Sequence, residues 1–486
     1  MRSRLYQSAM ILTVSFGLGL LFDYLFYRHG PGVNFPLYVG VLVLGWWAMS
    51  RQLGRLWRPS WLLAVAGFFA VMVAVRRSEL LTLLNLATCF GLLLMTVRVS
   101  RSPGWDRWQP RDWLATAALP VQFLGPLWQT LGSAARLDGS GRHRTRLRQV
   151  VTGMVIALPL LAVFTLLFAS ADAVFADYLS RLFTWQLHAD VVIQAWLVAI
   201  ASLGLTGAYS YALMADLVAA APPARAETSN RTLGLVETSV ALGLVGGLFL
   251  LFILLQIAYL FGGVHIIAQG VTYAEYARQG FFELLAVAVL TLVLILSADR
   301  YVTRGNRGHS RSFLWLASLL VSETLVILAS AFKRLWLYEQ AYGFTTLRLY
   351  SHAFSLLLVA VLGLVIYKIV LSRPLNWWLS RAFVATLAAL AALNMANPDG
   401  LIAQFNLGRY HQTGKIDTNY LMSLSNDAVP ALIPATAASD EATRTIAQNL
   451  AERAANGLEP YRPAWQEYNL SDWRAAEAVA PLETKH

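Results

Sequence analysis

The sequence predicts an all-α protein: a polytopic bundle of about eleven transmembrane helices with a small helical C-terminal domain on the outer face. Of its 486 residues, 57% are hydrophobic and only 13% are charged, whereas soluble globular proteins carry about 25% charged residues. The apolar residues form long runs, and arginines gather in short clusters between them. Lipid-facing helices joined by basic loops give this pattern.

The first apolar run, residues 9–22 after Arg2 and Arg4, has the layout of a secretion signal. No small-x-small cleavage site follows it, because the run continues into the acidic and aromatic residues 23–27. We therefore expect it to be retained as the first membrane helix.

Crossing hydrocarbon about 30 Å thick takes roughly 17–25 apolar residues as a helix. The candidate spans are 7–27, 36–49, 61–75, 80–97, 150–170, 191–214, 232–261, 281–298, 312–332, 349–371 and 383–395. They divide the chain into four parts: spans one to four (1–97), a cytoplasmic basic loop (98–149), spans five to eleven (150–397) and an extracytoplasmic helical tail (398–486).

Basic residues set the orientation, because Lys and Arg accumulate in cytoplasmic loops. With the N-terminus inside, 23 Lys and Arg residues lie on the cytoplasmic side and 8 in the short outer loops. The N-terminus is therefore predicted inside and the C-terminus outside.

The uncharged segment 113–135 could be a further span, but Pro120, Pro126 and two glutamines weaken a lipid-facing helix there. We expect an amphipathic stretch on the cytoplasmic surface, with neighbouring arginines of the 98–149 loop binding anionic phospholipid. Its headgroup-level tryptophans would be Trp105, Trp108, Trp113 and Trp128. A plain solvated loop is the alternative.

The polar tail has a helix signal: Ser439 precedes two acids, which suits a helix start. Ile446, Leu450 and Ala454 then share one face, and Gly457 ends the segment. These residues predict a small helical domain. Within the spans, Ser239, Gly243 and Gly247 recur every fourth residue and predict close helix packing.

Glu323 is the sharpest candidate for function. It lies about ten residues, or about 15 Å, into the span 312–332 and hence near the bilayer midplane. A carboxylate there costs at least ~2.5 kcal/mol unless it is neutralised or paired. It indicates either a proton or ligand site, or a protonated structural group bonded to a neighbouring helix.

Two aromatic-rich, mixed-charge segments are predicted on the outer side. The first contains His265, Glu275, Arg278 and Glu283, and the second contains Lys333, Arg334, Glu339, Arg348 and His352. They could form a polar mouth that binds a headgroup, glycan or peptide, although interfacial Tyr and Trp belts are routine in membrane proteins.

Other chemistry finds little support. Asp23, at the outer end of the first span, is a weak candidate for a lipid-linked glycosyltransferase, because no second acid follows in the next loop. The eight histidines lack metal-ligand spacing, and Cys89 is the only cysteine, so an intramolecular disulfide is excluded. We expect no metal and no cofactor. The clustering of the +11 net charge beside apolar runs argues against nucleic-acid binding.

Three segments resemble a known family: 272–284 (TYAEYARQGFFEL), 331–343 (AFKRLWLYEQAYG) with 346–350 (TLRLY), and 417–430 (DTNYLMSLSNDAVP). They are similar to the C-terminal half of a bacterial multi-pass membrane family catalogued as a domain of unknown function, the 4173 type. The resemblance implies a location in the bacterial cytoplasmic (inner) membrane. It implies no activity, cofactor or catalytic residue.

The leading hypothesis is a non-enzymatic membrane protein whose outer face and tail bind a protein or an envelope ligand, in sensing or assembly. The first alternative is a transporter or proton-coupled channel centred on Glu323. The second is a lipid-linked glycosyltransferase that uses Asp23.

Overall fold

The structure is a computed structural model of the full chain. It describes residues 2–53, 61–101, 104–134, 189–214, 235–261, 281–301, 307–437, 440–453 and 464–483.

All regular elements in this part of the chain are helices, which confirms the all-α prediction. In chain order they are α1 (Arg2–Phe26), α2 (Asn34–Gln52), α3 (Trp61–Val75), α4 (Glu79–Arg101), η1 (Trp105–Arg107), α5 (Pro110–Ala117), α6 (Leu119–Gln122), α7 (Leu124–Ala134), α10 (Ala189–Leu213), α11 (Leu235–Phe261), α13 (Phe281–Tyr301), α14 (Arg307–Tyr342), α15 (Thr346–Val370), α16 (Leu375–Ala396), α17 (Pro398–Thr413), α18 (Thr418–Ser423), η5 (Asn426–Ala428), α19 (Val429–Leu432), η6 (Ile433–Ala437), α20 (Glu441–Arg453), η8 (Trp465–Glu467) and α21 (Leu470–Glu483).

Seven of the described helices are long and apolar enough to cross a membrane. They belong to α1, α4, α10, α13, α14, α15 and α16, and α3 and α11 contribute shorter apolar stretches. The helices fit an integral membrane protein. The predicted span 150–170 lies outside the described residues, and the count of about eleven stays a prediction.

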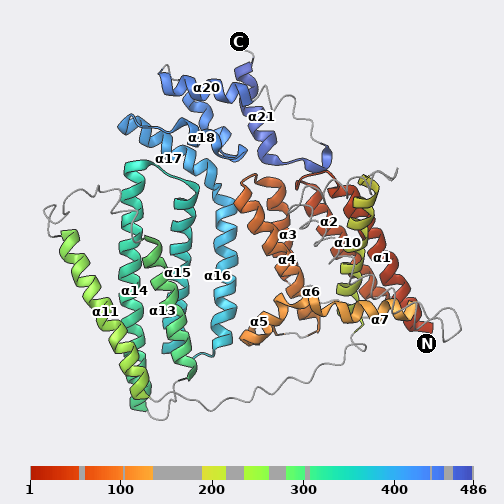
Figure 1. Ribbon diagram of the computed structural model, residues 1–486, viewed down its shortest axis with the longest axis horizontal. Coiled ribbons are helices and arrows are strands. Elements are labelled where there is room, and N and C mark those ends of the chain that lie inside the picture. The colour runs from red at the N-terminus through yellow and green to blue at the C-terminus, as the bar shows by residue number, and fades with distance from the viewer. Residues whose placement is uncertain are drawn as a thin grey trace, which may run out of the picture.

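The long helices form two groups (Figure 1). One contains α1, α2, α3, α4 and α10, in which α1 packs along α10 and α3 along α4. The other contains α11, α13, α14 and α15, and α16 stands between the two groups. Near its start α16 packs against α15 through Trp378, whereas Leu387 and Leu390 join the core formed by α3 and α4. One helix therefore holds the two groups together.

Helices α17 to α21 lie over one end of both groups, and we call them the cap (Figure 1). We call that end the C-terminal face and the opposite end the N-terminal face. The α1–α2, α3–α4 and α14–α15 connections all meet the cap. The distribution of Lys and Arg residues predicted that these three connections lie together on the outer side.

The segment 105–134 lies across the N-terminal face beneath α1 to α4 and α10 (Figure 1). Its longest helix, α7, has 11 residues, about 16 Å, and cannot cross a bilayer. That the segment lies on the cytoplasmic membrane surface stays a prediction. Three of the four tryptophans assigned to headgroup level pack on protein instead: Trp108 is buried, and the Trp105 and Trp113 rings contact Phe383 of α16.

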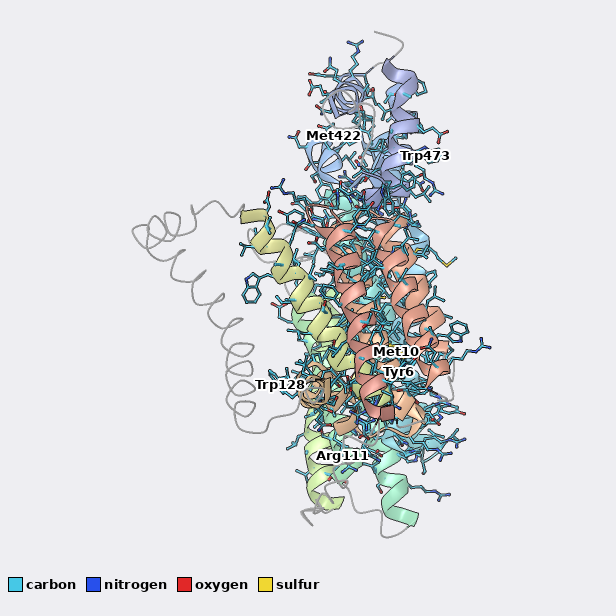
Figure 2. The ribbon with its side chains drawn as sticks, turned by 90° about the vertical axis from the view of Figure 1, so that its right-hand side faces the viewer. Tyr6, Met10, Arg111, Trp128, Met422 and Trp473 are labelled. Atoms are coloured by element: carbon cyan, nitrogen blue, oxygen red, sulfur yellow. The ribbon has the colours of Figure 1, made fainter. Side chains whose placement is uncertain are left out.

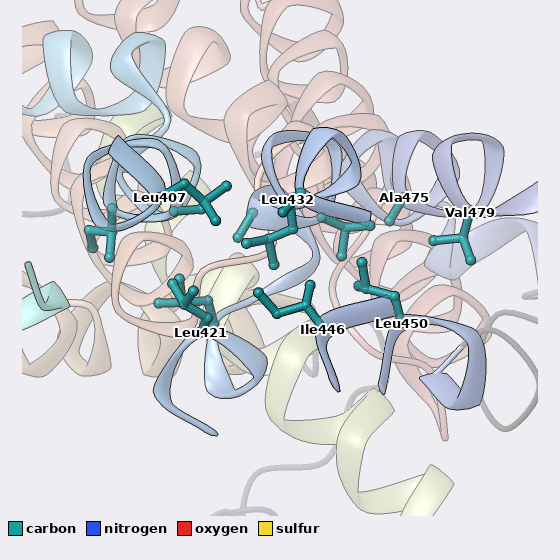
Figure 3. Packing of buried hydrophobic residues seen from close by; sticks show 13 residues of the cluster. Leu407, Leu421, Leu432, Ile446, Leu450, Ala475 and Val479 are labelled. Carbon is teal, nitrogen blue, oxygen red and sulfur yellow. The ribbon is translucent and has the colours of Figure 1, made fainter. Parts of the chain in front are cut away.

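The cap has its own apolar cluster (Figure 3). Ile446 and Leu450, which the sequence placed on one helix face, are fully buried there against residues of α17, α18, α19 and α21. Their helix is α20, whereas Ala454 and Ser439 lie outside the described residues. Whether the cap is a separate domain stays a prediction.

Candidate functional site at the junction of the cap and the membrane helices

The centre of the junction is the buried carboxylate of Asp427 in η5. One of its oxygens accepts hydrogen bonds from the backbone N–H groups of Arg77 (2.6 Å) and Ser78 (3.2 Å). These amides precede α4, so the carboxylate sits at the positive end of that helix, where anions are stabilised. Its other oxygen lies 3.4 Å from the guanidinium of Arg76.

Arg76 forms hydrogen bonds with the membrane helices as well as with the cap. Its guanidinium donates to the backbone carbonyl of Asn394 (2.7 Å) and to that of Met395 (3.3 Å). These are among the last carbonyls of α16, which have no acceptor role inside the helix. Arg76 therefore ties the α3–α4 connection, the end of α16 and the cap to one another.

A second carboxylate, Asp399, lies beside Asp427. The backbone N–H and the hydroxyl of Ser425 donate to one oxygen of Asp399 (3.2 and 2.5 Å), and the same hydroxyl lies 3.5 Å from Asp427. The other Asp399 oxygen is buried without a hydrogen bond. Burial raises the pKa of the Asp399 carboxyl, Ser425 opposes the rise and the Asp427 charge adds to it.

Helix α21 contributes a third acid, Asp472. It lies 3.4 Å from the side chain of Arg77 and accepts from the Asn426 amide at 2.7 Å. Nearby, the fully buried Asn469 amide donates to the backbone carbonyls of Val73 and Arg76, both at 3.1 Å. We call Arg76, Asp399, Ser425, Asp427 and Asp472 the junction cluster.

The cap also closes the end of the α14–α15 hairpin. Asn406 of α17 exchanges two hydrogen bonds with the backbone of Phe344 (2.9 and 2.8 Å). Arg409 donates to the Gln340 carbonyl (2.9 Å) and the Ala341 carbonyl (2.6 Å), which end α14. These bonds satisfy carbonyls that a free helix end would leave open.

The structure brings together two of the predicted outer-face residues, Glu339 and His352. Glu339 is fully buried, and its Oε2 lies 2.9 Å from Nε2 of His352. The His352 ring is tilted against the Phe332 ring, with the two centroids 4.2 Å apart. Glu339 Oε1 and His352 Nδ1 are buried without hydrogen bonds. Arg348 lies apart from this pair, over the Tyr338 ring at 4.1 Å, and bonds to the Gly343 carbonyl.

Glu323 is buried on α14, on the side that faces Gly246 of α11. A Cβ atom added at Gly246 would lie 3.4 Å from Glu323 Oε2, which has no hydrogen-bond partner. The glycine leaves room for the carboxylate. Glu323 is 16 residues from Glu339, about 24 Å along the helix, so the two acids form separate sites.

The remaining predicted residues do not join these groups. Asp23 is half-buried on α1, and its Oδ1 lacks a hydrogen bond. Glu283 and Lys333 are exposed, and Arg334 is half-buried. His265, Glu275 and Arg278 lie outside the described residues. Among the described residues, no group of three His, Cys, Asp or Glu side chains could hold a metal ion.

Sequence reasoning missed the junction cluster. One signal was present, since Asp427 lies in the segment 417–430 that carries the family resemblance. Arg76 and Arg77 counted only as loop charges, and Asp399 only as the start of a polar tail.

A scan against protein-family models matches residues 63–435 to "Domain of unknown function (DUF4153)". The match covers well over half of the chain. The chain belongs to this family. The expected membership of a family of unknown function is thus confirmed, although the matching model is DUF4153 and not the 4173 type. The matched region includes Arg76, Glu323, Glu339, Asp399 and Asp427, and excludes Asp23 and Asp472. No curated protein and no solved structure matches the chain.

Proposed function

We propose that this member of the DUF4153 family is a non-enzymatic protein of the bacterial cytoplasmic membrane whose cap binds a protein or an envelope ligand, in sensing or assembly. The N-terminus is inside and the cap outside. The observation that carries the proposal is the attachment of the cap to the α1–α2, α3–α4 and α14–α15 connections through buried and part-buried polar bonds. A displacement of the cap on ligand binding would therefore be transmitted to the membrane helices through these bonds.

Exposed aromatic side chains on the cap offer a binding surface. Trp465, Tyr468 and Trp473 are 50%, 38% and 44% exposed, and we call them the aromatic patch. Trp473 lies on the cap and Tyr6 toward the opposite end of the molecule (Figure 2). Tyr and Trp supply contact area to protein interfaces at low entropic cost. They also sit at headgroup level in many membrane proteins, so the test must separate the two roles.

A photo-crosslinking amino acid in place of Trp473, used in intact cells, tests the proposal. We expect a discrete adduct with one protein or glycan. The matched position is Trp47 near the end of α2 at the N-terminal face, which is 40% exposed and next to Arg51 and should not give this adduct. Adducts with phospholipid alone at Trp465, Tyr468 and Trp473 would remove the proposal.

Glu323 supports a second candidate, a transporter or proton-coupled channel. Its unpartnered oxygen is buried between α14 and α11, and the exposed rings Trp315 and Trp336 lie on either side of it along α14. They are 21 residues apart, about 31 Å, which matches hydrocarbon thickness. In proteoliposomes Glu323→Gln should abolish proton flux that the exposed-site variant Glu283→Gln retains, and equal flux in both would eliminate this candidate.

The glycosyltransferase alternative gains less support. Its catalytic carboxylate would be Asp23 alone. Asp190 reaches the same end of α1 but is paired with Arg28 at 2.7 Å.

Anionic phospholipid binding by the 98–149 loop remains part of the proposal. Its support is the exposed Arg107 and Arg111 beside the exposed Leu114 and Val121, a mixture of charge and apolar surface typical of interfacial helices.

A further inference from the structure

We propose that Asp399 is a proton-binding site through which pH controls how tightly the cap is held on the membrane helices. The inference rests on the proposed function only for the side of the membrane whose pH is read. The sensing role would then be regulated at the junction cluster itself.

Asp399 receives fewer hydrogen bonds than Asp427 and, among the described residues, has no guanidinium paired with it. Asp427 receives two backbone N–H groups and faces the Arg76 guanidinium, so its charge is compensated. Asp399 receives only the N–H and hydroxyl of Ser425, both on one oxygen. Its other oxygen is buried and open, and the residue is 4% exposed. A buried carboxylate with this little compensation favours the protonated form.

Asp399 and Asp427 compete for the proton of the Ser425 hydroxyl. It carries one proton, yet it lies within 2.5 Å of Asp399 and 3.5 Å of Asp427. When Asp399 is ionised, that proton cannot serve both carboxylates, and the two negative charges repel each other. When Asp399 is protonated, one negative charge is gone and the acid itself becomes a donor.

The groups that face Asp399 come from three elements. Asp427 belongs to η5, Tyr350 belongs to α15 and is close enough to interact with both acids, and Arg76 and Arg77 reach the cluster from the α3–α4 connection through Asp427. The Tyr350 hydroxyl is buried close to the Ser78 side chain and to both acids. The end of α16 (residues 394–396) and α19 also pack against α17, and neither carries a titratable side chain. Helix α14 meets α17 farther along, at Arg409.

The sign of the pH effect follows from linkage. Burial raises the pKa of Asp399 above its ordinary value of 3.8. A group whose pKa is higher in the folded state stabilises that state fully below the unfolded pKa, and this contribution is lost as the pH rises through the folded pKa. The cap is therefore held most tightly at acidic pH and loosens as the pH rises.

Hydrogen exchange on the full-length protein in lipid nanodiscs tests this, after correction for the pH dependence of intrinsic exchange. The reporters are the amides of Arg77, Ser78 and Ser425, which bond to the two acids. In the wild type their protection should fall with rising pH by up to about tenfold per unit, the slope for one proton. Asp399→Asn should stay protected throughout, whereas the exposed-site control Asp417→Asn should follow the wild type.

Two further measurements keep the inference testable if Asp399→Asn does not fold. Ser425→Ala removes a donor to the carboxylate, so the midpoint of the pH transition should move to higher pH. Infrared difference spectra of the wild type should show a carboxylic-acid C=O band, and the pH midpoint of this band should also move to higher pH in Ser425→Ala. A wild type whose junction protection does not vary with pH, or the same variation in Asp399→Asn, would overturn the inference. Neither result bears on whether the aromatic patch crosslinks to a ligand.

Discussion

Arg76 is the residue on which the junction cluster depends most, because one guanidinium serves two helix-end carbonyls and the Asp427 carboxylate. Arg76→Ala would leave Asp427 buried at the α4 terminus without its cation. Removing one partner of a buried ion pair typically costs about 3–5 kcal/mol. We expect a loss of this size in the free energy of unfolding, measured by denaturant titration in detergent micelles.

The matched control is Arg444→Ala on the exposed side of α20, which should change the free energy by no more than about 0.5 kcal/mol. Replacing both partners, in Arg76→Met with Asp427→Leu, should restore part of the loss, because no buried charge then remains unpaired. Equal stability of the two single alanine variants would contradict the role given to Arg76.

At the residue scale, the sequence pointed to a candidate functional residue where a charged side chain interrupts an apolar run. Glu323 in an apolar run stood out without a structure, and its side chain is buried. Arg76 and Asp427 could not be paired in advance, because they lie 351 residues apart and each looks ordinary in its own loop. Only the tertiary fold brings these two side chains into contact.

At the scale of elements, apolar length predicted where long apolar helices lie, but not where each helix ends. The span 312–332 was ended before Lys333, yet α14 continues to Tyr342. The helix stops where Gly343 adopts a left-handed φ of 82°, a conformation that suits glycine, and where Arg409 binds the terminal carbonyls. The second of these causes comes from the cap and was not readable locally.

Close helix packing was predicted at Ser239, Gly243 and Gly247 of α11, but no described atom lies within 4 Å of a Cβ added at either glycine. Helices α1 and α10, by contrast, approach each other closely. A Cβ at Gly19 would lie 2.8 Å from the backbone oxygen of Val198 and would also collide with the Ser202 hydroxyl. A small-residue repeat permits close packing, but which helix is the neighbour depends on the whole fold.

Gly19→Val should therefore push α1 away from α10 and lower the free energy of unfolding by about 1–3 kcal/mol, the usual cost of overpacking. Gly17 is exposed on the same helix, and a Cβ added there meets no atom within 4 Å, so Gly17→Val adds the same side chain on an open face. Thermal unfolding of the two variants in one detergent gives the comparison. A Gly17→Val variant as unstable as Gly19→Val would show that β-branching, and not the approach to α10, is the cause.

At the scale of the whole molecule, the cap bridges the two helix groups (Figure 1). One end of it binds the α14–α15 hairpin through Asn406 and Arg409. The other binds the α1–α2 and α3–α4 connections through residues 467–472. This bridge gives the proposed sensing role a physical basis, because a change at the cap acts on both groups at once.

The contact between the cap and the α1–α2 connection is tightest at Gly32. A Cβ added there would lie 2.5 Å from the backbone carbon of Glu467 and 2.8 Å from the Tyr468 oxygen, whereas one added at Gly30 meets nothing within 4 Å. Gly32→Ala should displace this segment and break the bond from the Val33 N–H to the Tyr468 carbonyl (2.9 Å).

Hydrogen exchange measures that displacement. The Val33 amide should exchange at least about tenfold faster in Gly32→Ala, since losing one protecting contact worth about 1.4 kcal/mol has this effect. Gly30→Ala keeps its N–H bond to Glu467 and should leave the Val33 amide protected. The Phe344 amide, which bonds to Asn406 at the far end of the cap, should stay protected in both variants, because that attachment is separate. Faster exchange at Phe344 as well would mean that the cap releases both helix groups together, as a single cooperative unit.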